Sequence, residues 1–367
     1  MILKSLTLKN FRSYRAETFT FAERVNLIHG ANAQGKTNLL EAVYFLLAFK
    51  PFKQVKHEEL ISFSAQECRI KGEIETSNGL DEVHIYLGGE KRTIRLNGKI
   101  VYKASNVLGR YQVVSFLPSD IELVKGSPQN RRRYLDGLIS ALEPEYLRYL
   151  KRYHRALSQR NAVLSKSPRL SPESLEVWDE KLAETGGKIV GKRKEYVTKM
   201  KSRVNKLYKL TSGIDADIDV IYTCTFETGK DPVSGLIAEL KSNFEKDRKR
   251  GHTTAGPHRD LLTFNVSGKD ASSFASQGEA KNLAFALKAS EIWLIKDRLG
   301  KTPVLLLDDV TSELDDNRKK FIFRLLKDFS GQVFITTTSK KEIGYSGEMK
   351  EFLIKGGRAV KSSYIDS

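Results

Sequence analysis

The sequence predicts an α/β fold that is built from both ends of the chain and interrupted by a helical domain. Apolar residues alternate with period two through much of residues 1–120, which is typical of strands. After about residue 120 they follow a helical period, and strand-like runs return after about residue 250. We therefore predict one domain from residues 1–120 and 251–367, and an inserted, coiled-coil-like helical domain from residues 121–250.

Short strands and one long helix account for most of this pattern. Apolar residues recur at three-, four- and seven-residue steps from Trp178 to Leu207, which predicts a long amphipathic helix with a basic outer face between 192 and 209. Asn97-Gly98 is typical of a type I′ hairpin turn. Strands are expected at 70–74, 83–87, 94–96, 113–116, 262–266, 304–307 and 333–336.

The charge balance of the 367-residue chain is strongly basic, with a formal net charge of +17. Such a charge favours nucleic acid or an anionic membrane surface as a partner. The longest apolar run, 42–49, is far shorter than the ~20 residues of a membrane-spanning helix. Cys68 and Cys224 lie in unrelated contexts, which indicates neither a disulfide framework nor a zinc site. We therefore expect a cytoplasmic protein without a membrane partner.

Residues 30–37 match the G-x-x-x-x-G-K-[ST] phosphate-binding pattern, between an apolar run at 25–28 and a helical pattern from Leu39. Glycines let backbone N–H groups close around phosphates, and the next helix presents its positive end to them. We expect Lys36 to reach the β- and γ-phosphates of a nucleoside triphosphate, and Thr37 to bind Mg²⁺. A chance glycine-rich turn would not explain the flanking strand and helix. The predicted nucleotide-binding residues are Gly30, Ala31, Asn32, Ala33, Gln34, Gly35, Lys36 and Thr37.

A second part of the site is predicted where the apolar run at 304–307 ends in two carboxylates, Asp308 and Asp309. A buried parallel strand would bring Asp308 beside the phosphates, where it is expected to bind Mg²⁺. Asp309 is expected to orient or deprotonate the attacking water, so Asp309 and Lys36 are the predicted catalytic residues. The alternative is that both carboxylates cap a following helix.

Two further motifs complete an ordered set: Ser276-Gln277-Gly278-Glu279, and Ser312-Glu313-Leu314-Asp315 directly after the acidic strand. By itself, Ser276 with Glu279 is a capping box at the start of a helix. With the phosphate loop and the paired carboxylates, the motifs resemble those of ABC-type P-loop ATPases, in which ATP joins two heads because the signature of one subunit covers the γ-phosphate held by the other. The resemblance implies an ATP-dependent homodimer. The implied signature in trans is Ser276, Gln277, Gly278 and Glu279, and the implied D-loop residues are Ser312 and Asp315.

Motifs along nearly the whole chain resemble one branch, the RecF recombination-mediator family of bacteria. The matching stretches are 10–14 (N-F-R-S-Y), 32–42, 123–128, 131–136, 159–161, 256–260 and 307–315. The chain departs from the family pattern in the loops at 51–53, 118–120 and 260–261, which puts local loop contacts in doubt rather than the ATP site.

This resemblance implies an ATP-controlled clamp that binds single- or double-stranded DNA at gaps or junctions in recombinational repair and replication-fork maintenance. It further implies mediator partners of the RecR and RecO type, and slow, DNA-stimulated hydrolysis of ATP with Mg²⁺ as a release step. Arg12 joins the implied nucleotide-binding residues, and a glutamine near Gln112 is a candidate sensor of the γ-phosphate, with its identity left open. For His258 and Arg259, a contact across the dimer and a local structural role both remain open.

Basic residues gather in several stretches, and we expect two copies joined by ATP to align them into one positive cleft. Contacts to phosphates would make DNA binding salt-dependent and largely independent of sequence. For any single lysine, the alternative is a solvated helix face. The candidate DNA-binding residues are Lys125, Arg131, Arg132, Arg152, Arg155, Lys192, Arg193 and Lys199.

Three other functions share the ATP motifs. The soluble ATPase subunit of a membrane transporter would carry a histidine after the last core strand, where this chain has threonines at 336–338. A coiled-coil chromosome-structuring ATPase needs far longer arms than the roughly 130 inserted residues provide at about 1.5 Å of rise each. A small-molecule kinase needs a phosphate-acceptor pocket, whereas the second carboxylate favours water as the acceptor.

Overall fold

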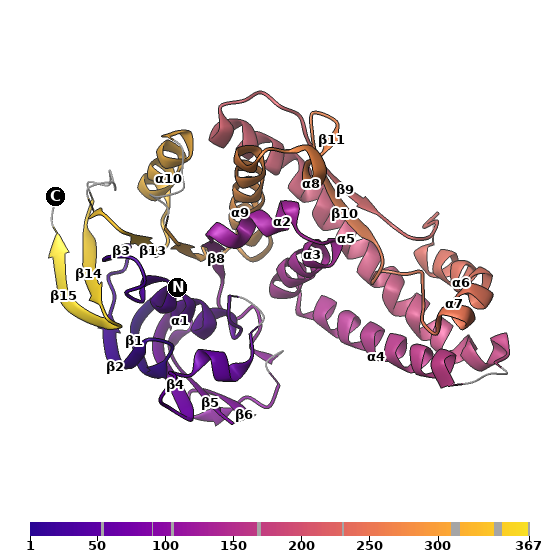
Figure 1. The fold of residues 1–367 in the computed structure, drawn as a ribbon, viewed down its shortest axis with the longest axis horizontal. Helices are drawn as coiled ribbons and strands as arrows, with labels where there is room; N and C mark the ends of the chain where they lie inside the picture. Colours follow the sequence, from indigo (N-terminus) through magenta and orange to yellow (C-terminus); the bar gives the residue numbers. More distant parts are fainter. Residues whose placement is uncertain are drawn as a thin grey trace. The chain divides into compact units, whose positions relative to one another are not determined.

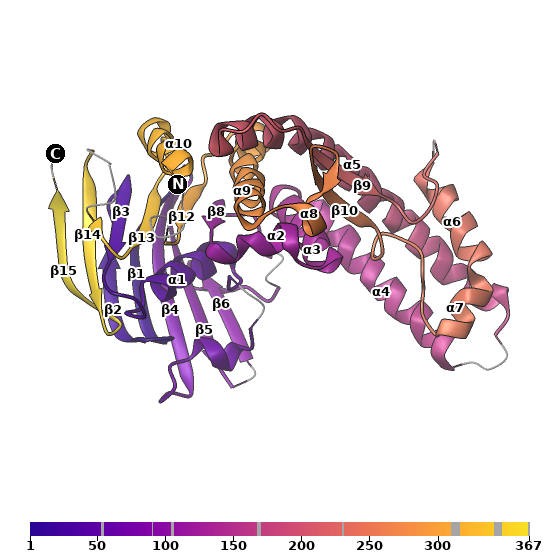
Figure 2. The ribbon, with the colours of Figure 1, turned by 45° about the horizontal axis from the view of Figure 1, so that its top comes forward.

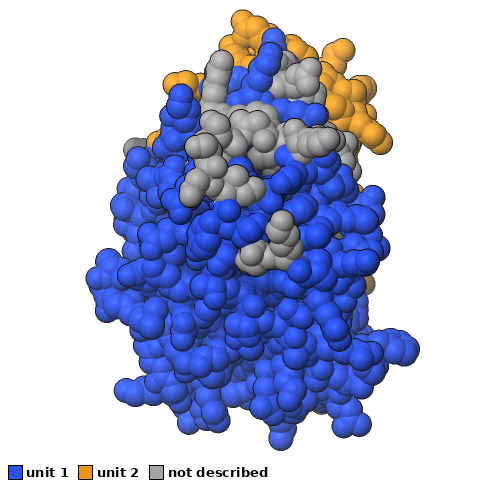
Figure 3. Space-filling model, turned by 90° about the vertical axis from the view of Figure 1, so that its left-hand side faces the viewer, with its two compact units in different colours: residues 1–120, 210–213, 288–367 blue, residues 121–209, 214–287 orange. Residues whose placement is uncertain are grey.

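The computed structural model describes residues 1–52, 55–89, 91–103, 106–166, 170–229, 231–309, 316–340 and 347–365. Figure 1 shows the fold with colours that follow the sequence, and Figure 3 colours the two compact units into which the chain divides. Unit 1 comprises residues 1–120, 210–213 and 288–367, and unit 2 comprises residues 121–209 and 214–287.

Unit 1 contains a sheet with the strand order β15-β14-β3-β13-β12-β8. The strands from β14 to β8 are parallel, and β15 is antiparallel to β14. Because β12 and β13 are buried along their whole length, they consist of continuous apolar or threonine runs rather than alternating ones. The bounds are β3 (Val25–His29), β8 (Val113–Phe116), β12 (Val304–Leu307), β13 (Val333–Thr337), β14 (Met349–Lys355) and β15 (Arg358–Ile365).

A second, antiparallel sheet of unit 1 has the order β2-β1-β4-β5-β6-β7. Helix α1 (Lys36–Ala48) lies between the two sheets and contacts strands of both, so it is apolar nearly all round (Figure 2). The Asn97-Gly98 turn is confirmed between β6 and β7, with positive φ at both residues. The bounds are β1 (Ile2–Phe11), β2 (Tyr14–Thr20), β4 (Glu67–Thr76), β5 (Gly79–Gly88), β6 (Lys91–Leu96) and β7 (Lys99–Ile100).

Unit 2 combines helices with a small antiparallel sheet of order β11-β10-β9. The predicted long helix is confirmed as α5 (Glu176–Ser212). The other helices are α2 (Glu122–Lys125), α3 (Pro128–Leu142), α4 (Pro144–Lys166), α6 (Pro232–Ser242), α7 (Phe244–Arg250) and α8 (Ala271–Phe274), and the strands are β9 (Ile218–Thr223), β10 (Leu261–Val266) and β11 (Lys269–Asp270). Helix α9 (Gln277–Leu299) begins in unit 2 and ends in unit 1, and α10 (Asp316–Asp328) belongs to unit 1. Short 3₁₀ turns occur at His57–Leu60, Pro118–Ile121 and Pro172–Leu175.

The units and the predicted domains share the boundary after residue 120 but differ at the second one. Residues 251–287 fall in unit 2 rather than with the carboxyl-terminal strands. The physical reason is pairing, since β10 is bonded to β9 from Leu261 opposite Thr223 to Val266 opposite Ile218. A strand-like run in the sequence predicts a strand but not the sheet that it joins.

Two arginines lie in the interior of unit 2. Arg193 is 2% exposed, and its Nε and Nη2 atoms each lie 2.9 Å from an Asp136 carboxylate oxygen. Arg160 is fully buried and donates to Asp179 and Asp247 over 2.6 and 2.7 Å. Burying an unpaired charge costs much free energy, so these carboxylates make the buried positions of both arginines possible.

His258 has a local structural role in unit 2. Its Nε2 lies 3.1 Å from the Thr253 carbonyl oxygen, so Nε2–H donates there and Nδ1 accepts from the Tyr153 hydroxyl over 2.7 Å. Burial lowers the pKa of His258 to about 4, which keeps the ring neutral in the folded protein. Of the two roles considered for His258, the structure thus favours the structural one, while the side chain of Arg259 is exposed.

The low pKa of His258 predicts that the folded protein becomes less stable at acidic pH. In the unfolded chain a histidine has a pKa of about 6.5, so between that value and about 4 the unfolded state binds more protons. The free energy of unfolding should therefore decrease as the pH falls through this window. We expect His258→Gln to lose less stability than the unchanged protein between about pH 7 and about pH 5 in denaturant unfolding. An identical pH dependence in both proteins would contradict the assignment.

Candidate nucleotide-binding site

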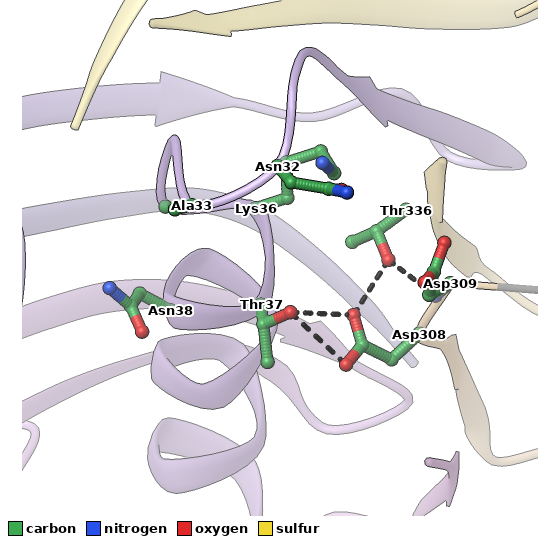
Figure 4. A pocket seen from close by; sticks show the side chains of 9 residues that line it. Asn32, Ala33, Lys36, Thr37, Asn38, Asp308, Asp309 and Thr336 are labelled. Atoms are coloured by element: carbon green, nitrogen blue, oxygen red, sulfur yellow. Dashed lines mark hydrogen bonds between the residues drawn. The ribbon is translucent and has the colours of Figure 1, made fainter. Parts of the chain in front are cut away.

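One edge of the parallel sheet brings together three segments that are distant in the sequence. The phosphate loop follows β3, Asp308 follows β12, and Thr336 lies near the carboxyl end of β13, between the other two strands. Because parallel strands end at the same edge, these segments surround one cavity (Figure 4). The cavity is lined by Asn32, Ala33, Gly35, Lys36, Thr37, Asn38, Asp308, Asp309 and Thr336.

The Asp308 carboxylate is held by two threonine hydroxyls. Thr37 Oγ1 donates to Asp308 Oδ1 and Oδ2 at 3.0 and 3.1 Å, and Thr336 Oγ1 donates to Oδ1 at 2.7 Å (Figure 4). Asp308 is 8% exposed, and burial raises its pKa. The same Thr336 hydroxyl accepts the backbone N–H of Asp309 over 2.8 Å. The two predicted Mg²⁺ ligands, Thr37 and Asp308, therefore lie in direct contact.

Lys36 is turned back onto the phosphate loop. Its Nζ donates to the carbonyl oxygens of Gly30 and Ala31, both over 2.8 Å. Burial lowers the pKa of Lys36, and the negative charges of Asp309 and Asp308 oppose this effect. The Lys36 ammonium is therefore within electrostatic range of both carboxylates. A stronger acceptor, such as a phosphate, can replace the loop carbonyls as its hydrogen-bond partner.

The shape of the loop depends on its glycines and on neighbouring turns. Gly30 has a φ of 148°, and an added Cβ would lie 2.4 Å from the Ile354 carbonyl oxygen. The Tyr14 hydroxyl donates to the Gly35 carbonyl over 2.9 Å, and the N–H of Gly356 donates to Gln34 Oε1 over 2.8 Å. Gln34 therefore bonds the β14–β15 turn and is not among the residues that line the cavity.

Two other predicted residues are engaged elsewhere. The Nε of Arg12 lies 2.9 Å from Glu41 Oε2 on α1, and Arg12 does not line the cavity, so its contact with nucleotide stays a prediction. Gln112 is 3% exposed and donates to the Gly109 carbonyl over 2.6 Å. It precedes the amino end of β8, whereas the cavity lies at the carboxyl ends of the strands, so Gln112 itself does not line the cavity.

The signature segment (residues 276–279) begins α9 with the predicted capping box. The N–H of Ser276 donates to Glu279 Oε2 over 2.8 Å, and the N–H of Glu279 donates to Ser276 Oγ over 3.2 Å. Helix capping is thus one role of these residues, and their action in trans stays a prediction. The predicted D-loop residues, Ser312 and Asp315, lie outside the described residues.

Thr336 lines the cavity, although the sequence did not indicate it as a site residue. In the sequence, Thr336 served only to show that the histidine of transporter ATPases is missing. In the structure, its hydroxyl joins Asp308 to the backbone of Asp309. A usable signal exists: two threonines end the apolar run of a strand that pairs with the acidic strand. That signal becomes specific only when the order of the strands is known.

The candidate DNA-binding residues of unit 2 fall into three groups. Arg152 and Arg155 are exposed on α4. Others have internal partners: Lys192 with Glu143 at 2.8 Å, Lys199 with Glu195 at 2.5 Å, Arg132 with the Asp260 carbonyl at 2.8 Å, and Lys125 with the carbonyls of Ser272 and Ala275. Arg131 and Arg193 are 6% and 2% exposed, which corrects their assignment, because a buried and bonded guanidinium cannot reach DNA phosphates.

Comparison with known proteins identifies the family. A family model described as the RecF/RecN/SMC N-terminal domain matches residues 2–352. A DNA replication and repair protein RecF from Natranaerobius thermophilus is 36% identical over 380 residues, covering 98% of this chain and 98% of the relative. The chain belongs to the RecF family. A RecF from Streptococcus equi subsp. zooepidemicus is also 36% identical, with all of both chains covered.

Solved structures agree with this assignment. The recombination mediator protein RecF-ATP in the RecFOR pathway aligns with a TM-score of 0.89 and 34% identity, covering 99% of this chain and 97% of that chain. An SMC head bound to the C-winged helix domain of ScpA aligns with a TM-score of 0.57 at 16% identity, which concerns the fold alone. The RecF resemblance and the predicted ABC-type ATPase head with a helical insertion are therefore confirmed. Within the described ranges, every helix is too short or too polar to span a lipid bilayer.

Proposed function

We propose that this RecF-family protein is an ATP-controlled clamp that binds single- and double-stranded DNA at gaps or junctions during recombinational repair and replication-fork maintenance. The observation that carries the proposal is the cluster of Thr37, Asp308 and Thr336 beside the phosphate loop. The similar RecF-ATP structure supports ATP as the nucleotide. We place the clamp in the cytoplasm, with mediator partners of the RecR and RecO type. The transporter alternative is not favoured, because the relatives are replication and repair proteins.

ATP binding is assigned to the loop and its lysine. Backbone N–H groups of residues 30–37 would surround the phosphates, and Lys36 would exchange the carbonyls of Gly30 and Ala31 for phosphate oxygens. Hydroxyl and carboxylate oxygens are the ligands that Mg²⁺ prefers, so Thr37 and Asp308 fit that ion. When bound, Mg²⁺ would stabilise the negative charge of the phosphates.

Hydrolysis is assigned to Asp309, which accepts a proton from the attacking water or orients it. We infer that turnover is slow, which suits a release step better than metabolism. DNA would stimulate this step by stabilising the dimer in which the site is complete. The signature segment of a second copy would complete it, since a helix amino terminus and the Ser276 hydroxyl both attract a γ-phosphate.

The test of this proposal is the molecular mass in solution with no nucleotide, with ADP, and with ATP and Mg²⁺. We expect dimers only with ATP, because ADP lacks the phosphate that the signature segment would contact. Ser276→Arg should stay monomeric, since it places a bulky side chain at the same point. A monomer under every condition would refute the clamp and leave Ser276 as a helix cap only.

DNA binding is assigned first to an exposed basic stripe on α4, which consists of Arg148, Lys151, Arg152 and Arg155. Residues three, four and seven positions apart share one face of a helix, so these cations can follow a DNA backbone. Arg152 and Arg155 have exposed side chains, whereas the charges of Lys192 and Lys199 are balanced by glutamates.

Replacing both Arg152 and Arg155 by glutamine should weaken DNA binding at every sequence tested. If each arginine neutralises one phosphate, the slope of log K against log salt should decrease in magnitude by about 2. Fluorescence anisotropy of labelled DNA at several salt concentrations measures both quantities. Lys199→Gln is the comparison, and its effect should be smaller because Glu195 already balances its charge. An unchanged salt slope in the double variant would move the DNA surface away from α4.

A further inference from the structure

The peptide group between Ala275 and Ser276 is held at both of its polar atoms. The Ala275 carbonyl oxygen accepts a hydrogen bond from Lys125 Nζ, and the Ser276 N–H donates to Glu279 Oε2 over 2.8 Å. With both ends bonded, the peptide plane cannot rotate without breaking a charge-assisted hydrogen bond. This plane determines the direction in which the Ser276 side chain leaves the backbone.

Lys125 also secures the short helix before the signature segment. Its Nζ lies 3.3 Å from the Ser272 carbonyl oxygen, one of the carbonyls that the end of α8 leaves without a helical partner. At the other end of α8, the Asp270 carboxylate accepts the Ser272 N–H over 2.9 Å. α8 and the peptide that follows it are therefore bonded on both sides.

The backbone that carries Lys125 is itself well anchored. The Arg131 guanidinium, buried in unit 2, donates to the Val124 carbonyl oxygen over 3.2 Å. Ser127 caps α3 by accepting the Asn130 N–H over 3.3 Å. At Gly126 an added Cβ would lie 2.3 Å from the Glu122 carbonyl oxygen, so the chain makes a turn there that leaves no room for a side chain.

The charge of Lys125 has a second effect on the signature segment. The pKa of Glu279 is lowered by its hydrogen bonds from Ser276 and, to a smaller extent, by the positive charge of Lys125. A bare carboxylate at this helix terminus would repel the phosphate of a nucleotide. Lys125 offsets that negative charge from within the same unit.

We propose that Lys125 is a positioning residue for the signature segment rather than a DNA contact. It holds the Ala275–Ser276 peptide so that the Ser276 hydroxyl and the start of α9 are already arranged for the nucleotide of a second copy. Such preorganisation lowers the conformational cost of dimerisation. This inference rests on the proposed clamp function and assigns to it Lys125, which the sequence had suggested as a DNA contact.

The test compares Lys125→Met with Lys125→Arg and with Lys188→Met, an exposed lysine on α5. In ATP and Mg²⁺ without DNA, the dimer dissociation constant of Lys125→Met should rise about tenfold, the usual effect of losing a charged hydrogen bond. Lys125→Arg should restore most of the affinity, and Lys188→Met should behave like the unchanged protein. ATP binding by the monomer and nucleotide-free DNA binding should be unchanged in Lys125→Met. If that variant does not fold, Lys125→Gln provides the same comparison.

Amide hydrogen exchange across residues 272–280 of the nucleotide-free monomer separates the two proposals. Faster exchange in Lys125→Met is expected whether or not dimers form, since it reports only the hold on the peptide. If the unchanged protein never dimerises, the proposed clamp function is wrong. The exchange result then tests by itself whether Lys125 holds the Ala275–Ser276 peptide. Unchanged exchange together with unchanged dimerisation would overturn the positioning role. Weaker DNA binding with normal dimerisation would return Lys125 to the DNA contacts.

Discussion

Asp309→Asn is expected to stop ATP turnover while leaving ATP-dependent dimers intact. Asparagine has nearly the same size as aspartate but cannot accept a proton from water, so the rate should fall by about 10²–10⁴. The backbone N–H of Asp309 is held by Thr336 over 2.8 Å, and asparagine tolerates the left-handed φ of 49° at this position, so the local geometry should survive.

Phosphate release in single-turnover conditions and solution mass measured on the same samples check this prediction. The variant should accumulate as a dimer in ATP and Mg²⁺, because hydrolysis no longer removes the γ-phosphate. Asp308→Asn is the matched control, and it should instead raise the Mg²⁺ concentration needed for ATP binding, since it removes a proposed ligand. Turnover by Asp309→Asn at the rate of the unchanged protein would assign the base to another group.

Asp136→Ala is expected to be strongly destabilising although it lies in no predicted catalytic position. It removes the carboxylate that pairs with Arg193 through two contacts of 2.9 Å and leaves a guanidinium that is 2% exposed. The Pro257 carbonyl, 2.7 Å from Nη1, cannot neutralise that charge. Breaking a buried pair in this way costs about 3–5 kcal/mol of unfolding free energy.

Denaturant unfolding in a Trp293→Phe background, followed by the fluorescence of Trp178 on α5, measures this loss in unit 2. The informative control is the double variant Asp136→Leu with Arg193→Met, which removes both charges. It should be less destabilised than Asp136→Ala, because apolar residues of similar size replace a buried ion pair at little cost. A loss no larger than that of Arg133→Ala, an exposed change on the same helix, would mean that Arg193 is not held by this pair.

Features whose partners are close in the sequence were predictable. The phosphate loop, the Asn97-Gly98 turn and the Ser276–Glu279 capping box each join residues within a few positions, so spacing alone carries the geometry. The α/β class and the long helix α5 follow from periodicity for the same reason. The order of the motifs along the chain was also enough to indicate the RecF family.

Burial of charged residues was not predictable from periodicity. Arg193 was expected on the basic outer face of α5, but the structure turns it inward to Asp136, a residue 57 positions earlier. A helical pattern indicates which face is apolar, but a carboxylate from another helix can make a charged residue acceptable inside. The partners of Lys125 were not predictable either, since they lie about 150 residues later in the chain.

By itself, the sequence determined the class of the fold, the phosphate loop and the acidic strand, because each is a local pattern with its own stereochemistry. Only the tertiary structure decided that Thr336 joins Asp308 to Asp309, that residues 251–287 pack with the helical unit, and which basic residues remain exposed. Strand order, sheet partners and ion pairs depend on contacts between segments far apart in the chain. Those contacts are selected by the free energy of the whole fold rather than by any short stretch of it.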